Sequence, residues 1–258
     1  MSEIKEKKVK KEKEYKVPSR KRPIYKVVQC FLRLLYRKPK VINLAGDIAD
    51  KSIVVANHSA KSGPPALDLY YPKFTVKWGA HEMLGNYSSR KAYLRDILYI
   101  KKCGKKPGFA TSFKASFIAL FSLRVYRGMR MMGTYQDGRF ATTLRNSVKV
   151  LDAGMSIMVY PENSNEGYKE VLTEFFPGFV MLAEKYYRQK GEDLPVYPVY
   201  YSIKKRIMVI GKPMYVQEFV KQGLDRYQIA QRYCEAVNQL YFDYVQEKEE
   251  KTESAVTE

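Results

Sequence analysis

One of the two histidines in this 258-residue chain stands where an apolar run breaks into a polar turn. The run SIVVAN (52–57) leads directly into His58, and Pro64 and Pro65 follow shortly afterwards. Proline suits the first turn of a helix, where its missing N–H costs nothing. The pattern predicts a strand, a turn that presents His58, and then a helix. A neutral imidazole in such a place can take a proton near pH 7, so we expect His58 to act as a general base. The alternative is a histidine that only closes its own loop.

A second polar cluster has the same position relative to an apolar run. The run SIMVYP (156–161) is followed by Glu162, Asn163 and Ser164. Functional groups of α/β proteins gather in the loops at the carboxyl ends of strands, which is where both clusters are expected. Glu162 is therefore a candidate to face a substrate, and the alternative is a carboxylate that caps the following turn.

The elements that would position these residues can be read from hydrophobic periodicity. β-rich runs occupy residues 52–57, 74–79, 96–102, 156–161, 195–201 and 206–211. Helical patterns with one apolar face occupy residues 138–154, 175–191 and 225–245. Strands that alternate with helices indicate a sheet covered on both faces. We therefore predict a single α/β domain over residues 41–246, with a central sheet that is mixed but mostly parallel.

Positive charge is concentrated at the start of the chain. Residues 1–40 contain 15 Lys and Arg against 4 Glu, within a net charge of +19. We interpret residues 1–22 as a basic disordered arm, 23–40 as an amphipathic helix and 247–258 as an acidic disordered tail. A basic amphipathic helix can lie in the interface of an anionic membrane with its apolar face down. The alternatives are a helix that packs on the domain and an arm that only aids solubility.

Several functional classes lack their sequence signatures. No uncharged apolar stretch reaches the roughly 20 residues that cross a bilayer, and no secretory signal is recognisable. Three widely spaced cysteines suit a reducing compartment, so we expect a cytoplasmic protein. No Walker loop, dinucleotide fingerprint or Cys–Cys metal spacing is present. The His81–Glu82 pair suggests a zinc helix, but Gly85 stands where the second histidine is required, so we interpret His81 as structural.

Four blocks in order give the chain a family likeness. They are NHSAKSGP (57–64), MRMMGTYQD (129–137), VYPENSNEGY (159–168) and LPVYPVY (194–200), followed by VIGKPMYV (209–216). In this order and spacing, the chain resembles the glycerolipid acyltransferases, which acylate glycerol 3-phosphate or lysophosphatidate. The resemblance implies acyl transfer from acyl-CoA or acyl-carrier protein to the hydroxyl of a lysophospholipid or glycerol phosphate, with His58 as base. It implies no metal and no cofactor beyond the acyl donor.

The resemblance also implies roles for residues around the two clusters. Asn57 and Ser59 would shape the His58 loop, and Glu162 would contact the acceptor. Lys61 could meet an acceptor phosphate or the phosphopantetheine of a carrier. Asn163 and Ser164 stand where the family has Gly-Thr.

Two departures from the family pattern concern the most functional positions. Gly63 stands where the family has the aspartate that orients the histidine, so Asp68, Glu82, Glu162 or a backbone carbonyl would have to take that role. Gln136 aligns with the arginine that holds acceptor phosphate.

Arg130 or Arg139 could replace that arginine, since glutamine cannot give the charged bidentate grip of a guanidinium.

Two other functional classes stay open because of these departures. One is a catalytically inactive lipid-binding relative with the same fold. The other is a basic nucleic-acid-binding protein, in which the 22 tyrosines could stack on bases. Most tyrosines fall in strand and helix patterns, so we expect no nucleic acid and predict a peripheral membrane protein.

Overall fold

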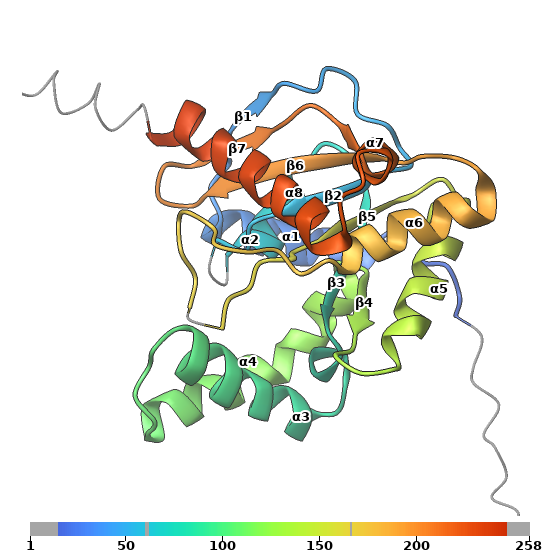
Figure 1. The fold of residues 1–258 in the computed structure, drawn as a ribbon. Helices are drawn as coiled ribbons and strands as arrows, with labels where there is room; N and C mark the ends of the chain where they lie inside the picture. Colours follow the sequence, from blue (N-terminus) through green and yellow to red (C-terminus); the bar gives the residue numbers. More distant parts are fainter. Residues whose placement is uncertain (1–14, 60–61, 166, 247–258) are drawn as a thin grey trace, which may run out of the picture.

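A single mixed sheet forms the centre of the computed structural model, which describes residues 15–59, 62–165 and 167–246 (Figure 1). Its strand order is β1-β7-β6-β2-β5-β3-β4, and β8 pairs with β6. The strands are β1 (Lys40–Asn43), β2 (Ile53–Ala56), β3 (Thr75–Ala80), β4 (Met131–Thr134), β5 (Ser156–Val159), β6 (Pro195–Ser202), β7 (Ile207–Ile210) and β8 (Met214–Tyr215). Neighbours from β6 to β4 are parallel, whereas β7 and β8 run antiparallel to β6. The arrangement confirms the predicted single α/β domain with a mixed, mostly parallel sheet.

Helices cover both faces of the sheet, and a helical lobe extends beyond one edge (Figure 1). They are α1 (Pro23–Leu35), α2 (Gly63–Tyr70), α3 (Tyr87–Ala92), α4 (Phe109–Gly128), α5 (Phe140–Asp152), α6 (Gly178–Lys190), α7 (Val216–Lys221) and α8 (Arg226–Tyr241), with short helical segments η1 (His81–Leu84), η2 (Tyr93–Lys102) and η3 (Phe242–Gln246). The three helices predicted from periodicity are α5, α6 and α8.

The two faces of β2 show how the sheet divides the core. Ile53 and Val55 point to the larger cluster, which α5, α6 and α8 cover. Val54 and Ala56 point to the opposite face, where Leu67 of α2 packs. Side chains alternate between faces along a strand, so a strand buried on both sides reads as a continuous apolar run. This is why SIVVAN is recognisable as a strand in the sequence.

The strand predicted over residues 96–102 is wrong. These residues belong to η2, which continues α3 into the helical lobe. Leu94 and Tyr99 point inward and form a small cluster with Ala115 and Ala119 of α4. A short apolar run does not separate strand from helix, and here the partner surface is a helix.

Residues 15–22, predicted to belong to a mobile arm, instead lie against the domain. Arg20 donates a hydrogen bond to the carbonyl oxygen of Gly154, and the Arg130 guanidinium donates one to the carbonyl oxygen of Ser19. The rest of that arm and the acidic tail lie outside the described residues. Among the helices of the described chain, none is long and apolar enough to cross a membrane.

Candidate functional site

The loop that carries His58 is fixed by backbone contacts at both ends. Asn57 is buried and exchanges two hydrogen bonds with the backbone of Tyr201, at 3.0 Å from its amide nitrogen and 2.7 Å to its amide oxygen. This pair joins the end of β2 to the end of β6. The chain then turns through Ser59, whose φ of 41° is left-handed, and the Gly63 N–H donates to the His58 carbonyl at 3.1 Å. His58 is thereby presented half-buried at the carboxyl edge of the sheet.

Gly63 approaches the His58 carbonyl too closely for any side chain. A Cβ atom there would lie 2.3 Å from the His58 oxygen, well inside van der Waals contact. The backbone is therefore close enough here that the position accommodates glycine and no larger residue without a shift of the loop.

We expect Gly63→Ala to destabilise the protein by about 1–3 kcal/mol, because the new methyl group must displace the loop. Chemical denaturation measures this directly. Gly138→Ala is the matched control, since a Cβ atom at Gly138 meets nothing within 4 Å. Equal stability of the two variants would contradict the close approach at Gly63.

Glu162 holds His58 through the backbone. It follows β5, the strand next to β2, and its Oε2 accepts the His58 N–H at 2.9 Å. The side chain is buried, and burial raises the pKa of the Glu162 carboxyl, although the N–H groups of His58 and Lys169 and the charge of Lys102 oppose this rise. Sequence reasoning placed Glu162 in the site, and the structure gives it a contact with the His58 main chain.

We expect Glu162→Gln to be more stable than the wild type at pH 7, by roughly 0.5–2 kcal/mol. The amide keeps an oxygen for the His58 N–H and removes a buried charge. Because folding raises the pKa of Glu162, its ionised form costs stability, and this cost vanishes below the unfolded pKa of about 4.3. Denaturation at pH 7 and pH 4 should therefore show a gain that shrinks in acid. The exposed Glu235→Gln is the control, and a gain that persists at pH 4 would contradict the burial argument.

Two tyrosines lie beside the imidazole, and a lysine lies over one of them. The His58 ring lies 5.3 Å from the ring of Tyr160 and 4.9 Å from the ring of Tyr168, between centroids. Lys102 Nζ lies 5.6 Å from the Tyr168 ring, and burial lowers the pKa of Lys102. Sequence reasoning missed Tyr168 as a site residue, and it missed Lys102 because the apolar pattern of residues 96–102 predicts a strand.

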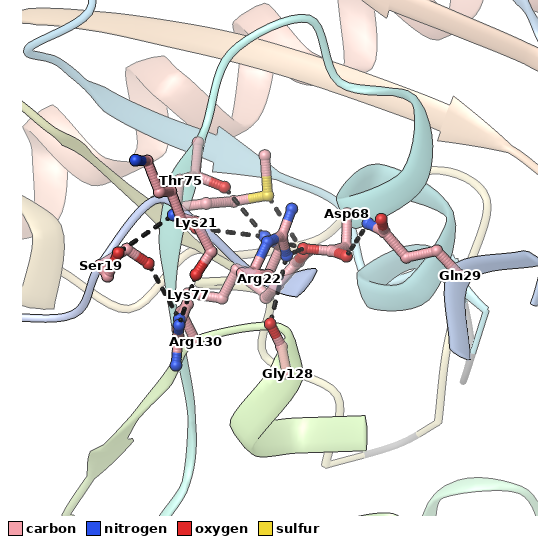
Figure 2. Close-up of polar contacts among 11 residues, drawn as sticks. Ser19, Lys21, Arg22, Gln29, Asp68, Thr75, Lys77, Gly128 and Arg130 are labelled. Carbon is pink, nitrogen blue, oxygen red and sulfur yellow. Dashed lines mark hydrogen bonds and ion pairs between the residues drawn. The ribbon is translucent and has the colours of Figure 1, made fainter. Parts of the chain in front are cut away.

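Asp68 was a candidate to orient His58, but its carboxylate belongs to a separate network of ion pairs and hydrogen bonds (Figure 2). Its Oδ1 is 2.8 Å from Lys77 Nζ and 2.8 Å from Arg22 Nη1, and its Oδ2 accepts from Gln29 at 3.2 Å. Burial alone would raise the pKa of Asp68, but Lys77 and Arg22 hold it below its ordinary value. The carboxylate thus joins α2, β3, α1 and the segment that leads into α1, and its partners are two cations and an amide rather than the imidazole.

Arg130 lies at the amino-terminal ends of the parallel strands, whereas His58 lies at their carboxyl-terminal ends. It precedes β4, so it stands at the amino end of that strand, and its guanidinium donates to the carbonyl oxygens of Ser19 and Lys21 (Figure 2). The expectation that Arg130 holds an acceptor phosphate beside His58 does not fit this position.

Gln136 and Arg139 follow β4 at the carboxyl edge, and both are exposed. Two strands separate β4 from β2, which corresponds to roughly 14 Å at the usual strand spacing. Arg139 pairs with Asp137 at 2.7 Å and lies over the ring of Tyr135 at 4.4 Å. These residues form a separate group along the edge.

His81 and Glu82 belong to that group rather than to the His58 loop. The imidazole Nδ1 of His81 is 3.2 Å from Glu82 Oε2, and its ring lies 4.5 Å from that of Tyr135. Within the described ranges, no group of three or more His, Cys, Asp or Glu side chains is arranged to hold a metal ion.

The remaining predicted residues are in the loop after β5 and in the His58 turn. Asn163 donates to Glu174 Oε2 at 2.8 Å, and Ser164 is buried. Both lie next to Glu162, so they support its loop. Lys61 lies outside the described residues.

Comparison with known proteins gives a structural likeness. No family model matches the chain, and no curated protein matches its sequence. A crystal structure of the 1-acyl-sn-glycerophosphate (LPA) acyltransferase PlsC from Thermotoga maritima is similar, with 18% sequence identity and a TM-score of 0.48. The match covers 84% of this chain and 79% of that one.

Proposed function

We propose that this protein transfers an acyl group from a thioester donor to a hydroxyl group, with His58 as the general base. The observation that carries the proposal is the His58 loop, in which β2 ends at the carboxyl edge and Glu162 from the neighbouring strand fixes the His58 main chain. The four sequence blocks support the same chemistry. Glu162 acts here as a positioning residue, since its contact is with the backbone.

The reaction needs one proton shuttle. As the acceptor oxygen adds to the thioester carbonyl, the His58 imidazole takes the hydroxyl proton. Collapse of the tetrahedral intermediate breaks the C–S bond, and the imidazolium returns the proton to the departing thiolate. The ester and the free thiol are the products, and the neutral imidazole is regenerated.

The proposed donors are acyl-CoA and acyl-carrier protein, and the proposed acceptors are lysophospholipids and glycerol phosphate. Lys102 Nζ lies 5.6 Å from the centroid of the Tyr168 ring, which is itself 4.9 Å from the His58 ring, and its positive charge suits a phosphate group. In this proposal Lys102 takes the role of the phosphate-holding arginine that the resemblance implies, for which Arg130 and Arg139 were the candidates. Asn57 and Ser59 shape the loop, while Asn163 and Ser164 hold the neighbouring one.

The proposed location is the cytoplasmic surface of an anionic membrane. Tyr25 of α1 faces the domain, but other apolar side chains of this helix point outward, and Ile24, Leu34 and Leu35 are at least 75% exposed. Together with the basic residues of the first 40 positions, this face suits an amphipathic helix in a lipid interface. Salt should weaken the electrostatic part of this binding.

The test is release of free thiol from acyl-CoA and acyl-carrier protein. Lysophosphatidate, glycerol 3-phosphate and non-phosphorylated lysolipids are supplied in turn. Release that depends on an acceptor and is lost in His58→Ala supports the proposal and identifies the acceptor class. Vesicle binding without turnover on any acceptor points to a lipid-binding relative, which the closed loop at Gly63 also suits.

A further inference from the structure

Helix α4 differs from an ordinary surface helix, because its small side chains face the domain and its large apolar side chains face outward. Its inner face is made of small residues, with Ala115, Ala119 and Ser122 buried against the helical lobe. Its outer face carries large apolar side chains that are between 52% and 86% exposed, namely Phe109, Phe113, Phe117, Leu120 and Phe121. A surface helix normally turns its apolar stripe toward the core.

The exposed side chains form one continuous stripe. Spacings of three and four residues place them on the same side of a helix, over three turns. The rings also contact one another along the surface, with centroids 6.2 Å apart for Phe109 and Phe113 and 5.6 Å apart for Phe117 and Phe121. An exposed apolar stripe of this length is typical of an interaction surface.

The charge around the stripe indicates what covers it. Residues 97–136 contain eight Lys and Arg and no Asp or Glu. Of these, Lys105, Lys106, Lys114 and Arg124 are exposed beside or on α4. Aromatic side chains flanked by cations, with no carboxylate among them, suit the acyl-chain boundary and phosphate headgroups of an anionic bilayer.

The C-terminal end of α4 contacts the helix already proposed to contact lipid. The carbonyl of Gly128, at the end of α4, accepts a hydrogen bond from Arg22 at 3.2 Å, just before α1 begins (Figure 2). A Cβ atom on Gly128 would lie 2.0 Å from the Tyr25 ring, so α1 and α4 are in direct contact at this glycine. Two exposed apolar helices thus share one junction.

We propose that α4 inserts its phenylalanine stripe into an anionic lipid bilayer, beside α1. This deepens the membrane location proposed above, and it does not require that the protein be an acyltransferase. The thiol-release test of His58 and the lipid-binding test of α4 are therefore independent.

Co-sedimentation with vesicles tests the stripe, using phosphatidylcholine alone and phosphatidylcholine mixed with phosphatidylglycerol. In Phe113→Ser/Phe117→Ser, we expect binding to the anionic vesicles to weaken at least tenfold, because the variant removes two large apolar side chains from the surface that would be buried in the bilayer. Tyr227→Ser is the matched control, since Tyr227 is a 66% exposed aromatic residue on α8. Equal vesicle binding by both variants would overturn the proposal.

A conservative variant reports insertion without weakening the stripe. We expect the emission of Phe117→Trp to shift to the blue on vesicle binding and to be quenched by lipids brominated in the acyl chains. Tyr227→Trp should show neither change. The proposal would be overturned if the emission of Phe117→Trp stayed unquenched while the protein was bound to vesicles. It would also be overturned if Phe113→Ser/Phe117→Ser lost binding to RNA but kept binding to vesicles.

Discussion

Replacement of His58 by alanine should lower acceptor-dependent thiol release by roughly 10²–10⁴-fold, the usual contribution of a general base. The effect should be large because an alcohol is a poor nucleophile for a thioester, and the described loop offers the imidazole at the strand end. Stability should change little, since the His58 main chain, which makes the contacts to Glu162 and Gly63, is retained.

The chain contains a matched control in its other histidine. His81 is also half-exposed, but it contacts Glu82 and Tyr135 in the separate group near β4. His81→Ala should therefore keep thiol release within a few-fold of the wild type. Full activity in His58→Ala, or equal losses in the two variants, would refute the role of His58 as base.

Removal of the Asp68 carboxylate should have the largest effect on stability. Lys77 is only 2% exposed, and Asp68→Ala leaves its ammonium group buried without the counter-charge at 2.8 Å. Breaking a buried pair in this way typically costs about 3–5 kcal/mol. Chemical denaturation of Asp68→Ala at pH 7 measures the loss.

Two comparisons separate this network from ordinary ion pairs. Glu235→Ala breaks the exposed pair with Arg232 and should cost at most about 1 kcal/mol. The double variant Asp68→Asn/Lys77→Met also removes the buried ammonium group and should recover part of the loss, while the Arg22 guanidinium keeps its hydrogen bond to the Gly128 carbonyl but loses its counter-charge. If Asp68→Ala lost no more stability than Glu235→Ala, the buried network would not make the expected contribution to the free energy of unfolding.

The loss should also depend on pH. Since folding lowers the pKa of Asp68, its ionised form stabilises the protein. This contribution is present above the unfolded pKa of about 3.9 and is lost as the pH falls through the lower folded value. The difference between wild type and Asp68→Ala should therefore shrink in strong acid.

The strands that carry the site were predictable because they are buried on both sides. β2 and β5 are short, mostly apolar runs, and polar residues follow shortly after each strand, at Asn57 and at Glu162. The sequence could place His58 and Glu162 at strand ends, but it could not show that β2 and β5 are neighbours. Strand order depends on contacts between segments about 100 residues apart.

The errors have equally local causes. The outer phenylalanines and inner alanines of α4 reverse the usual pattern, so apolar periodicity gives no indication of which face is buried. Arg130 is close to Gln136 along the chain, but a four-residue strand between them puts the two at opposite edges of the sheet. Asp68 follows His58 by ten positions, yet Lys77 lies nine positions beyond Asp68 and pairs with it from the next strand.

The closed loop at Gly63 also bears on how this sequence can evolve. A single substitution at Gly63 brings a Cβ atom to 2.3 Å from the His58 carbonyl oxygen, so a larger residue fits there only after the loop has opened. The effect of the substitution therefore depends on its neighbours, which is epistasis with a visible steric cause.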